Sequence, residues 1–255
     1  MSDAVFRFYA ELNDFLPLKR RQVEFSLPFT PVVTVKHLIE SLGVPHTEVD
    51  LILVNGESTG FDYPVENGDQ ISVYPVFETL NITSLNHLHP QPLRDPRFVL
   101  DAHLGRLAAY LRMLGFDTLY CNDYSDPLLA EISVDEGRIL LTRDRGLLKR
   151  KEIVRGYCVW SIVPFEQVRE ILHRFDLAGI IHPFSRCLRC NGLLKKVAKA
   201  EVISSLQPRT SQYYDEFLRC ETCGQVYWKG SHYVRMLKII RELENVWEDG
   251  EISNF

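Results

Sequence analysis

The sequence predicts an α/β protein whose mostly parallel sheet carries helices on both faces, with a small α+β domain before it and a zinc ribbon after it. Three observations lead to this fold class. Short apolar strands alternate with helices between residues 97 and 182, as in parallel sheets. Strand-like runs flank a single helix within residues 1–79. Two Cys-X-X-Cys pairs fall within residues 183–240.

The first segment, residues 1–79, is predicted to form two strands, a helix and two further strands, in that order. Thr34 is a suitable N-cap for the helix, and Gly43 a suitable stop. Asn-Gly pairs after the third strand and before the last one are turn signals. The predicted strands are Val5–Tyr9, Val23–Leu27, Leu51–Val54 and Gln70–Val76, and the predicted helix is Val35–Leu42.

This segment resembles the β-grasp, ubiquitin-like fold of the small sulfur-carrier proteins, on the stretches Val5–Tyr9, Thr34–Leu42, Leu51–Gly56 and Gly68–Val76. Sulfur carriers act through a free C-terminal Gly-Gly. Here the last strand runs on into Phe77-Glu78-Thr79. The resemblance therefore implies a docking or substrate-presenting domain and argues against thiocarboxylate chemistry.

The alternation of strands and helices begins after a polar stretch, residues 80–96, which contains three prolines and reads as a linker. Apolar residues at helical spacing follow the first strand, and Gly115 ends that helix. Asp126 reads as an N-cap, with Pro127 at the first helical position. The predicted strands are Phe98–Leu100, Thr118–Tyr120, Ile139–Thr142 and Tyr157–Val163, and the predicted helices span 104–114, 126–136, 147–152 and 165–177.

Length and composition fit this organisation. The chain of 255 residues suffices for two or three domains of about 100 residues, and 45% apolar content is globular. We expect domains at 1–79 and 97–182, a linker at 80–96, a ribbon with a closing helix at 183–240 and an acidic tail at 241–255. The N-terminus lacks a signal-peptide pattern and no uncharged run near the middle could span a bilayer, so we expect a soluble, cytoplasmic protein.

The net charge of −5 is unevenly distributed. Residues 1–80 carry 5 Lys/Arg and 12 Asp/Glu, whereas residues 81–240 carry 23 and 17, and residues 241–255 carry 1 and 5. The mildly basic central part permits a nucleic-acid partner, although ordinary scatter of charge accounts for it equally well.

The four cysteines Cys187, Cys190, Cys220 and Cys223 are predicted to bind one zinc ion. Each Cys-X-X-Cys pair presents two thiolates on a tight turn, and two pairs complete a tetrahedron. Four thiolates leave no open position for water, so the zinc is structural. A partly helical insertion, residues 198–206, accounts for the long spacing between the pairs. Cys121 and Cys158 lie at apolar strands and read as inert thiols.

Acidic residues follow the predicted strands. Asp101 comes directly after one strand, Asp144 just after another, and Asp123 and Asp126 lie after a third. Because ligands of open α/β sheets bind at the carboxyl ends of strands, we expect these acids at one edge. Carboxylates that gather without a cation repel one another, and their oxygen atoms suit Mg²⁺ or Mn²⁺. The sequence therefore predicts a catalytic metal site, although each acid alone could be an N-cap or turn residue.

Basic residues surround the last of these acids. Arg143, Arg145 and Lys149 are candidates for binding phosphate, as is Arg106 on the first helix of the α/β segment. Arg112 also lies off the apolar stripe of that helix and could reach the same edge. The alternative for these residues is a solvated helix face.

Several motifs together resemble one known family. They are the segment from Asp101 to Asp117 (DAHLGRLAAYLRMLGFD), the segment from Arg138 to Arg145 (RILLTRDR), the two Cys-X-X-Cys pairs, and the segment from Tyr227 to His232 (YWKGSH). The chain from about 97 to 240 resembles the Mut-seven C-terminal family of PIN-like ribonuclease domains with an appended zinc ribbon. An N-terminal ubiquitin-like domain also occurs in bacterial members of that family, which fits residues 1–79.

This resemblance implies a PIN-like sheet and a metal-dependent ribonuclease. The PIN acids carry over onto Asp101, Asp126 and Asp144, while Asp123 and Glu131 compete for a fourth place. RNA is the implied partner, with Mg²⁺ or Mn²⁺ as catalytic ion and the ribbon assisting RNA binding. The alternative is a non-catalytic RNA-binding adaptor whose N-terminal domain recruits a protein partner.

Overall fold

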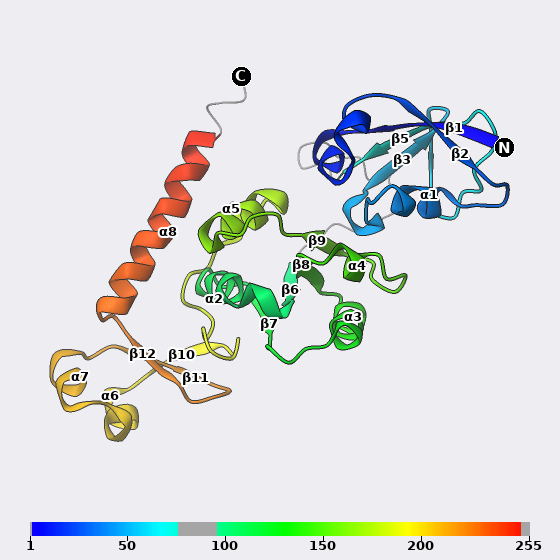
Figure 1. Ribbon diagram of the computed structural model, residues 1–255. Coiled ribbons are helices and arrows are strands. Elements are labelled where there is room, and N and C mark those ends of the chain that lie inside the picture. The colour runs from blue at the N-terminus through cyan, green and yellow to red at the C-terminus, as the bar shows by residue number, and fades with distance from the viewer. Residues whose placement is uncertain (1, 76–95, 251–255) are drawn as a thin grey trace. The chain divides into compact units, whose positions relative to one another are not determined.

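The computed structural model describes residues 2–75 and 96–250 (Figure 1). Most of the predicted linker, residues 80–95, and the end of the predicted tail, residues 251–255, lie outside the described residues. One compact unit contains the described residues up to 96 together with 125–158, and the other contains 97–124 and the described residues from 159 onward. Within the described ranges, no helix is both long and apolar enough to cross a bilayer.

The N-terminal segment forms a mixed five-stranded sheet in the order β2-β1-β5-β3-β4. Strands β1 and β5 pair in parallel, and the other neighbours pair antiparallel. Figure 1 shows α1 lying along one side of this sheet. The elements are β1 (Ser2–Phe8), β2 (Phe25–Phe29), α1 (Val35–Ser41), β3 (Leu51–Val54), β4 (Glu57–Thr59) and β5 (Gln70–Tyr74). The predicted β-grasp domain is confirmed, with a short extra strand β4.

Local sequence signals account for the ends of these elements. The Thr34 hydroxyl accepts a hydrogen bond from the His37 N–H at 3.3 Å, which caps α1. Gly43, at φ +103°, ends it. Asn55 and Gly56 both have positive φ, as a tight hairpin turn between β3 and β4 requires. The predicted second strand begins later than expected, at Phe25, and Val23 is exposed.

A four-stranded sheet in the order β7-β6-β8-β9 carries the predicted acids. Strands β6 and β7 pair in parallel, as do β8 and β9. Helices α2 and α5 pack together, while α3 and α4 pack against β8. The elements are β6 (Arg97–Leu100), α2 (Gly105–Met113), β7 (Asp117–Tyr120), α3 (Asp126–Asp135), β8 (Ile139–Thr142), α4 (Arg145–Leu148), β9 (Gly156–Cys158) and α5 (Pro164–Arg174). The predicted fold class is confirmed.

Strand β9 is shorter than the predicted strand Tyr157–Val163. The carboxylate of Glu170, in α5, accepts hydrogen bonds from the N–H groups of Trp160 at 2.7 Å and Ser161 at 3.0 Å. These two N–H groups therefore bond to a side chain instead of continuing a strand.

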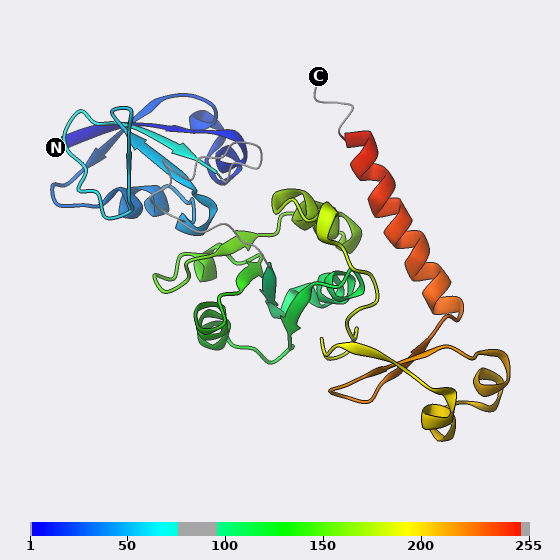
Figure 2. The ribbon, with the colours of Figure 1, turned by 180° about the vertical axis from the view of Figure 1, so that it is seen from behind.

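The C-terminal part forms a small antiparallel sheet in the order β10-β11-β12. A partly helical insertion separates β10 from β11, as predicted, and includes an additional short helix, α7 (Figure 2). A long helix, α8, follows β12. The elements are β10 (Leu194–Val197), α6 (Lys199–Val202), α7 (Pro208–Tyr213), β11 (Phe217–Cys220), β12 (Val226–Trp228) and α8 (Ser231–Gly250).

Candidate metal centre and strand-end acids

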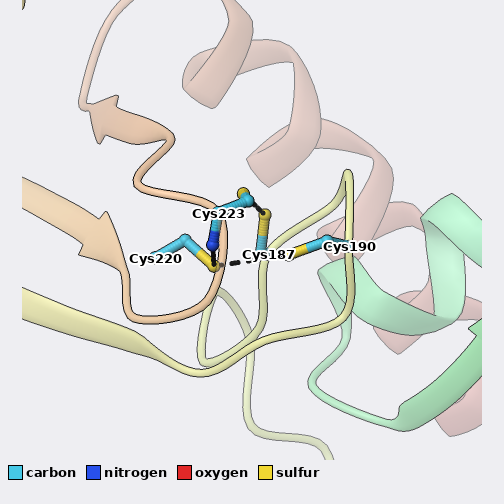
Figure 3. Close-up of side chains that lie close together, drawn as sticks. All are labelled: Cys187, Cys190, Cys220 and Cys223. Carbon is cyan, nitrogen blue, oxygen red and sulfur yellow. Dashed lines mark hydrogen bonds between the residues drawn. The ribbon is translucent and has the colours of Figure 1, made fainter.

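The four predicted zinc ligands meet in the ribbon, where their side chains point toward one another (Figure 3). All four sulfur atoms lie within 4.8 Å of one another. Cys187 Sγ lies 3.7 Å from Cys223 Sγ, and Cys190 Sγ lies 3.4 Å from Cys220 Sγ. Zn–S bonds of about 2.3 Å in a tetrahedron separate the sulfur atoms by about 3.8 Å. The predicted cluster is confirmed, and its donors and spacing fit a structural zinc ion.

The backbone of the two turns explains how the thiols converge. Gly224 has φ +72°, as expected for a turn that reverses the chain. In the first turn Asn191, at φ +71°, adopts the left-handed conformation that the motif would place at Gly192. Gly192 is needed for another reason: a Cβ atom there would lie 2.9 Å from Cys220 Sγ and would also meet Thr222.

Burial and neighbouring groups shift the pKa of two of the cysteine thiols. Burial alone would raise the pKa of the Cys187 thiol, but hydrogen bonds from the Tyr227 hydroxyl and from nearby backbone groups lower this pKa to about 7. Burial raises the pKa of the Cys190 thiol to about 12. Cys187 is thus the more readily ionised of this pair, and a bound cation would ionise its partner. The cysteine spacing alone did not predict this role for Tyr227.

Two buried polar residues connect the first cysteine turn to α2 and β7 of the same compact unit. The Asn191 side chain accepts a hydrogen bond from the Thr118 N–H at 2.9 Å and donates one to Asp117 at 2.7 Å. Arg112 donates to the Thr118 carbonyl at 2.9 Å and to the carbonyls of residues 188 and 189, both at 3.1 Å. The interpretation of Arg112 as a residue near the strand-end acids is wrong, because its side chain is only 4% exposed and its guanidinium is engaged here.

Asp101 directly follows β6 and caps a 3-10 turn, Ala102–Leu104, by accepting the Ala102 N–H at 2.6 Å. The Tyr120 hydroxyl, at the end of β7, donates to the Ala102 carbonyl at 2.9 Å and so supports this turn, and the Asn122 side-chain oxygen is a second acceptor for the same proton. A Cβ atom added at Gly105 would lie only 2.5 Å from that hydroxyl oxygen and would collide with it. Asp123 is exposed in the loop after β7. The sequence contained no signal for Tyr120 as a support for Asp101.

The other three acids lie in the segment 125–158. Asp144 follows β8 and caps α4, accepting the Gly146 N–H at 2.7 Å. Asp126 is exposed and begins α3, but Ser125 rather than Asp126 is the N-cap residue, which corrects that prediction by one position. Glu131 is exposed in the same helix. Among the described residues, the four cysteines form the single group of three or more ligating side chains within 4.8 Å, and the acids form none.

The predicted phosphate-binding residues differ in their surroundings. Arg106 and Arg143 are exposed. Lys149 Nζ donates a hydrogen bond to the Glu40 carbonyl of the N-terminal domain at 2.8 Å, and the Arg145 guanidinium lies 4.9 Å from the centre of the Phe15 ring. Two of these four cations therefore contact the N-terminal domain within one compact unit.

Comparison with protein-family models agrees with this architecture. Residues 96–240 match the model described as the Mut7-C RNAse domain, and residues 1–81 match the model described as Mut7-C ubiquitin. The chain belongs to the Mut7-C RNAse domain family. Its N-terminal domain is the ubiquitin-like domain of that family, and its C-terminal part contains the four-cysteine cluster.

The individual proteins that match this chain have low sequence identity to it or match only part of it. The Mut7-C chain is 35% identical over 107 residues to the human protein named "Exonuclease mut-7 homolog", a match that covers 39% of this chain and 12% of that protein. Two crystal structures of small archaeal modifier protein 1 from Haloferax volcanii match at 16% identity and a TM-score of 0.25, covering 30% and 31% of this chain and 100% and 99% of theirs.

Proposed function

We propose that this Mut7-C protein is a metal-dependent ribonuclease that hydrolyses RNA phosphodiester bonds. The observation that supports the proposal best is the match of residues 96–240 to the Mut7-C RNAse domain model, because this stretch contains all of the strand-end acids. Asp101 follows strand β6 and Asp144 follows strand β8, so each carboxylate lies at the carboxyl end of its own strand. Ligands of such sheets bind at the carboxyl ends of the strands.

In this proposal Asp101, Asp126 and Asp144 hold Mg²⁺ or Mn²⁺, and Asp123 or Glu131 supplies a fourth carboxylate. The donor set fits such an ion, because hard divalent cations prefer carboxylate oxygen. A bound ion of this kind would lower the pKa of a water molecule and neutralise charge on the phosphate. Since the acids do not form one group in the described part of the structure, their approach around the cation is part of the proposal.

The cations have a separate role in this proposal. Arg106 and Arg143 are exposed and available to hold phosphate. Arg145 and Lys149 would do so only by releasing their contacts with Phe15 and Glu40. The ribbon would add affinity for RNA, because residues 183–240 carry ten Lys/Arg and four Asp/Glu.

The test is hydrolysis of single-stranded and structured RNA with Mn²⁺ by the full chain and by a variant carrying Asp101→Asn and Asp144→Asn. We expect the double variant to lose at least about a hundredfold in rate, because carboxylates that hold a catalytic ion contribute several kcal/mol. Asp135→Asn is the matched control, since Asp135 is an exposed acid at the far end of α3. Equal rates for the wild type and the double variant would refute the proposal.

A second candidate function is a non-catalytic RNA-binding adaptor. The observation that favours it is the absence of a grouped carboxylate site among the described residues, beside a basic ribbon. In that case the double variant would bind RNA as the wild type does and neither would cleave it. In both candidates we propose a protein partner for the ubiquitin-like domain and a cytoplasmic location for the chain.

A further inference from the structure

A cavity of about 340 Å³ lies between the ribbon sheet and the start of α8. Aromatic and aliphatic side chains form much of its wall: Phe184, Leu218, Tyr227, Trp228, Tyr233 and Met236. The cavity is at the small end of the size range for ligand pockets. It is therefore suited to a flat ring rather than to a folded segment of protein.

The aromatic wall is held in a defined geometry. The rings of Phe184 and Tyr233 have centroids 4.7 Å apart, at an interplanar angle of 40°. Phe184 adopts φ +60°, which is costly for a bulky residue, and its N–H donates to the Met113 carbonyl at 2.9 Å. The chain thus maintains an unfavourable backbone conformation where it presents this ring to Tyr233. Trp228 is 37% exposed at the wall of the same cavity, so part of the wall is open to solvent.

A lysine occupies the same sheet face as the apolar wall. Lys196 is the direct cross-strand neighbour of Leu218, which in turn is the neighbour of Tyr227, so the three side chains share one face. Arg186 and Lys229 also line the cavity, but they form ion pairs with Asp117 and Glu216. Lys196 is exposed and forms no ion pair within 4.0 Å in the described part of the chain. The hydrogen bond and the charge of Lys229 lower the pKa of Glu216, which also lines the cavity, and the charge of Lys196 contributes to the same shift.

The distribution of charge within the Mut7-C domain also favours an anionic ligand at the ribbon. Residues 81–182 carry thirteen Lys/Arg and thirteen Asp/Glu, whereas residues 183–240 carry ten and four. The positive excess of the Mut7-C domain therefore lies entirely in the ribbon part. An aromatic cavity with a cation beside it, on a basic surface, matches the chemistry by which proteins bind unpaired nucleotides.

We propose that this cavity binds one unpaired nucleobase of a single-stranded RNA, with Lys196 holding the adjacent phosphate. The base would stack on the exposed part of the aromatic wall, which is a contact that any of the four bases can make. The proposal rests on the proposed function, because it takes RNA to be the substrate. It adds that the ribbon recognises single-stranded rather than fully paired RNA.

The experiment uses the zinc-loaded chain of 255 residues and a seven-nucleotide oligouridylate with 2-aminopurine at its centre, without added Mg²⁺ or Mn²⁺. Stacking quenches 2-aminopurine fluorescence, so the wild type should quench it on binding. Trp228→Ala and Tyr233→Ala should each weaken binding by about 5- to 100-fold, whereas Tyr233→Phe should retain it. Lys196→Ala should weaken binding and lower its dependence on salt. Tyr213→Ala is the matched control, because Tyr213 is 70% exposed in α7 and does not line the cavity.

Zinc content and far-UV circular dichroism establish that each variant is folded, and Lys196→Ala and Tyr233→Phe alter no core packing. The proposal is overturned if 2-aminopurine stays bright in the saturated complex, or if the two alanine variants bind as tightly as Tyr213→Ala. It is also overturned if the wild type binds a duplex of the same length more tightly than the single strand, or binds only peptides. Quenching without cleavage under Mn²⁺ would support the cavity and refute the nuclease, whereas cleavage without quenching would do the reverse.

Discussion

The carboxylate of Glu48, in the ubiquitin-like domain, accepts a hydrogen bond from the backbone N–H of Cys158 in β9 at 2.5 Å. Strand β9 is at the end of the strand order, where backbone groups are open to solvent or to another chain. Glu48 is only 1% exposed, so its carboxyl group is buried against this edge. Nearby, His46 Nε2 lies 2.7 Å from the Ile153 carbonyl oxygen. The ubiquitin-like domain is thus hydrogen-bonded to residues 125–158, which belong to the same compact unit.

We predict that Glu48→Ala destabilises the protein by about 1–3 kcal/mol, because it leaves the buried Cys158 N–H without this acceptor. Glu48→Gln keeps an oxygen acceptor and should cost less. Chemical denaturation of the full chain measures both. Glu57→Gln is the control, since Glu57 is an exposed acid on β4. Equal unfolding midpoints for Glu48→Ala and Glu57→Gln would show that the hydrogen bond contributes nothing.

The turn that carries Asp101 depends on Tyr120, and this gives a prediction about activity. Tyr120→Phe removes the hydroxyl that donates to the Ala102 carbonyl, so the carboxylate of Asp101 should be held less firmly. We expect RNA cleavage under Mn²⁺ to fall by about tenfold, with little change in zinc content. Tyr110→Phe, on α2, serves as the comparison because its hydroxyl does not support that turn. A Tyr120→Phe variant that cleaves RNA at the wild-type rate would mean that the turn needs no such support.

Local signals in the sequence predicted the parts of the molecule that depend on local chemistry. The cysteine spacing identified the cluster because each pair is a turn of four residues, and Thr34 identified the start of α1 because capping involves only three following residues. The strand-end acids were located for the same reason, since hydrophobic runs mark where strands stop. Whether those acids meet depends on distant parts of the chain, and the sequence contains no local signal for that.

Arg112 shows why long-range contacts escaped prediction. Its carbonyl partners, Leu188 and Arg189, are 76 and 77 residues away in sequence. Helical periodicity showed only that Arg112 lies off the apolar stripe of α2. That position is equally compatible with an exposed side chain and with a buried one that donates hydrogen bonds to carbonyl groups. Lys149 is similar, because its partner Glu40 is 109 residues away. Asn191 had a usable signal, since Asn-Gly favours positive φ.

Removal of one thiol from the cluster tests the zinc assignment. We predict that Cys220→Ser lowers the zinc content from about one ion per chain to well below one, because three thiolates do not complete the tetrahedron. The part of the ribbon between the cysteine pairs, residues 187–223, should then become sensitive to protease, since the metal supplies its folding energy. Cys121→Ser is the matched control, as Cys121 lies outside the cluster. Metal analysis and limited proteolysis measure the two effects, and a Cys220→Ser ribbon that stays protected would contradict a structural role for zinc.

The backbone and the side chain of Asn191 both stabilise the contact between the cysteine turn and β7, and two substitutions distinguish their contributions. Its backbone occupies φ +71°, and its side chain bonds to the Thr118 N–H and to Asp117. Asn191→Gly keeps the favourable backbone but leaves the fully buried Thr118 N–H unpaired, which should cost about 1–3 kcal/mol. Asn191→Ala loses the same bonds and adds strain from the left-handed backbone, so it should be less stable than Asn191→Gly by about 1 kcal/mol. Denaturation midpoints of the zinc-loaded proteins give both differences, with Leu193→Ala, at an exposed neighbouring position, as the reference. If both Asn191 variants matched that reference, the ribbon would be attached to β7 mainly by Arg112 and Arg186, whose guanidinium groups contact the same region.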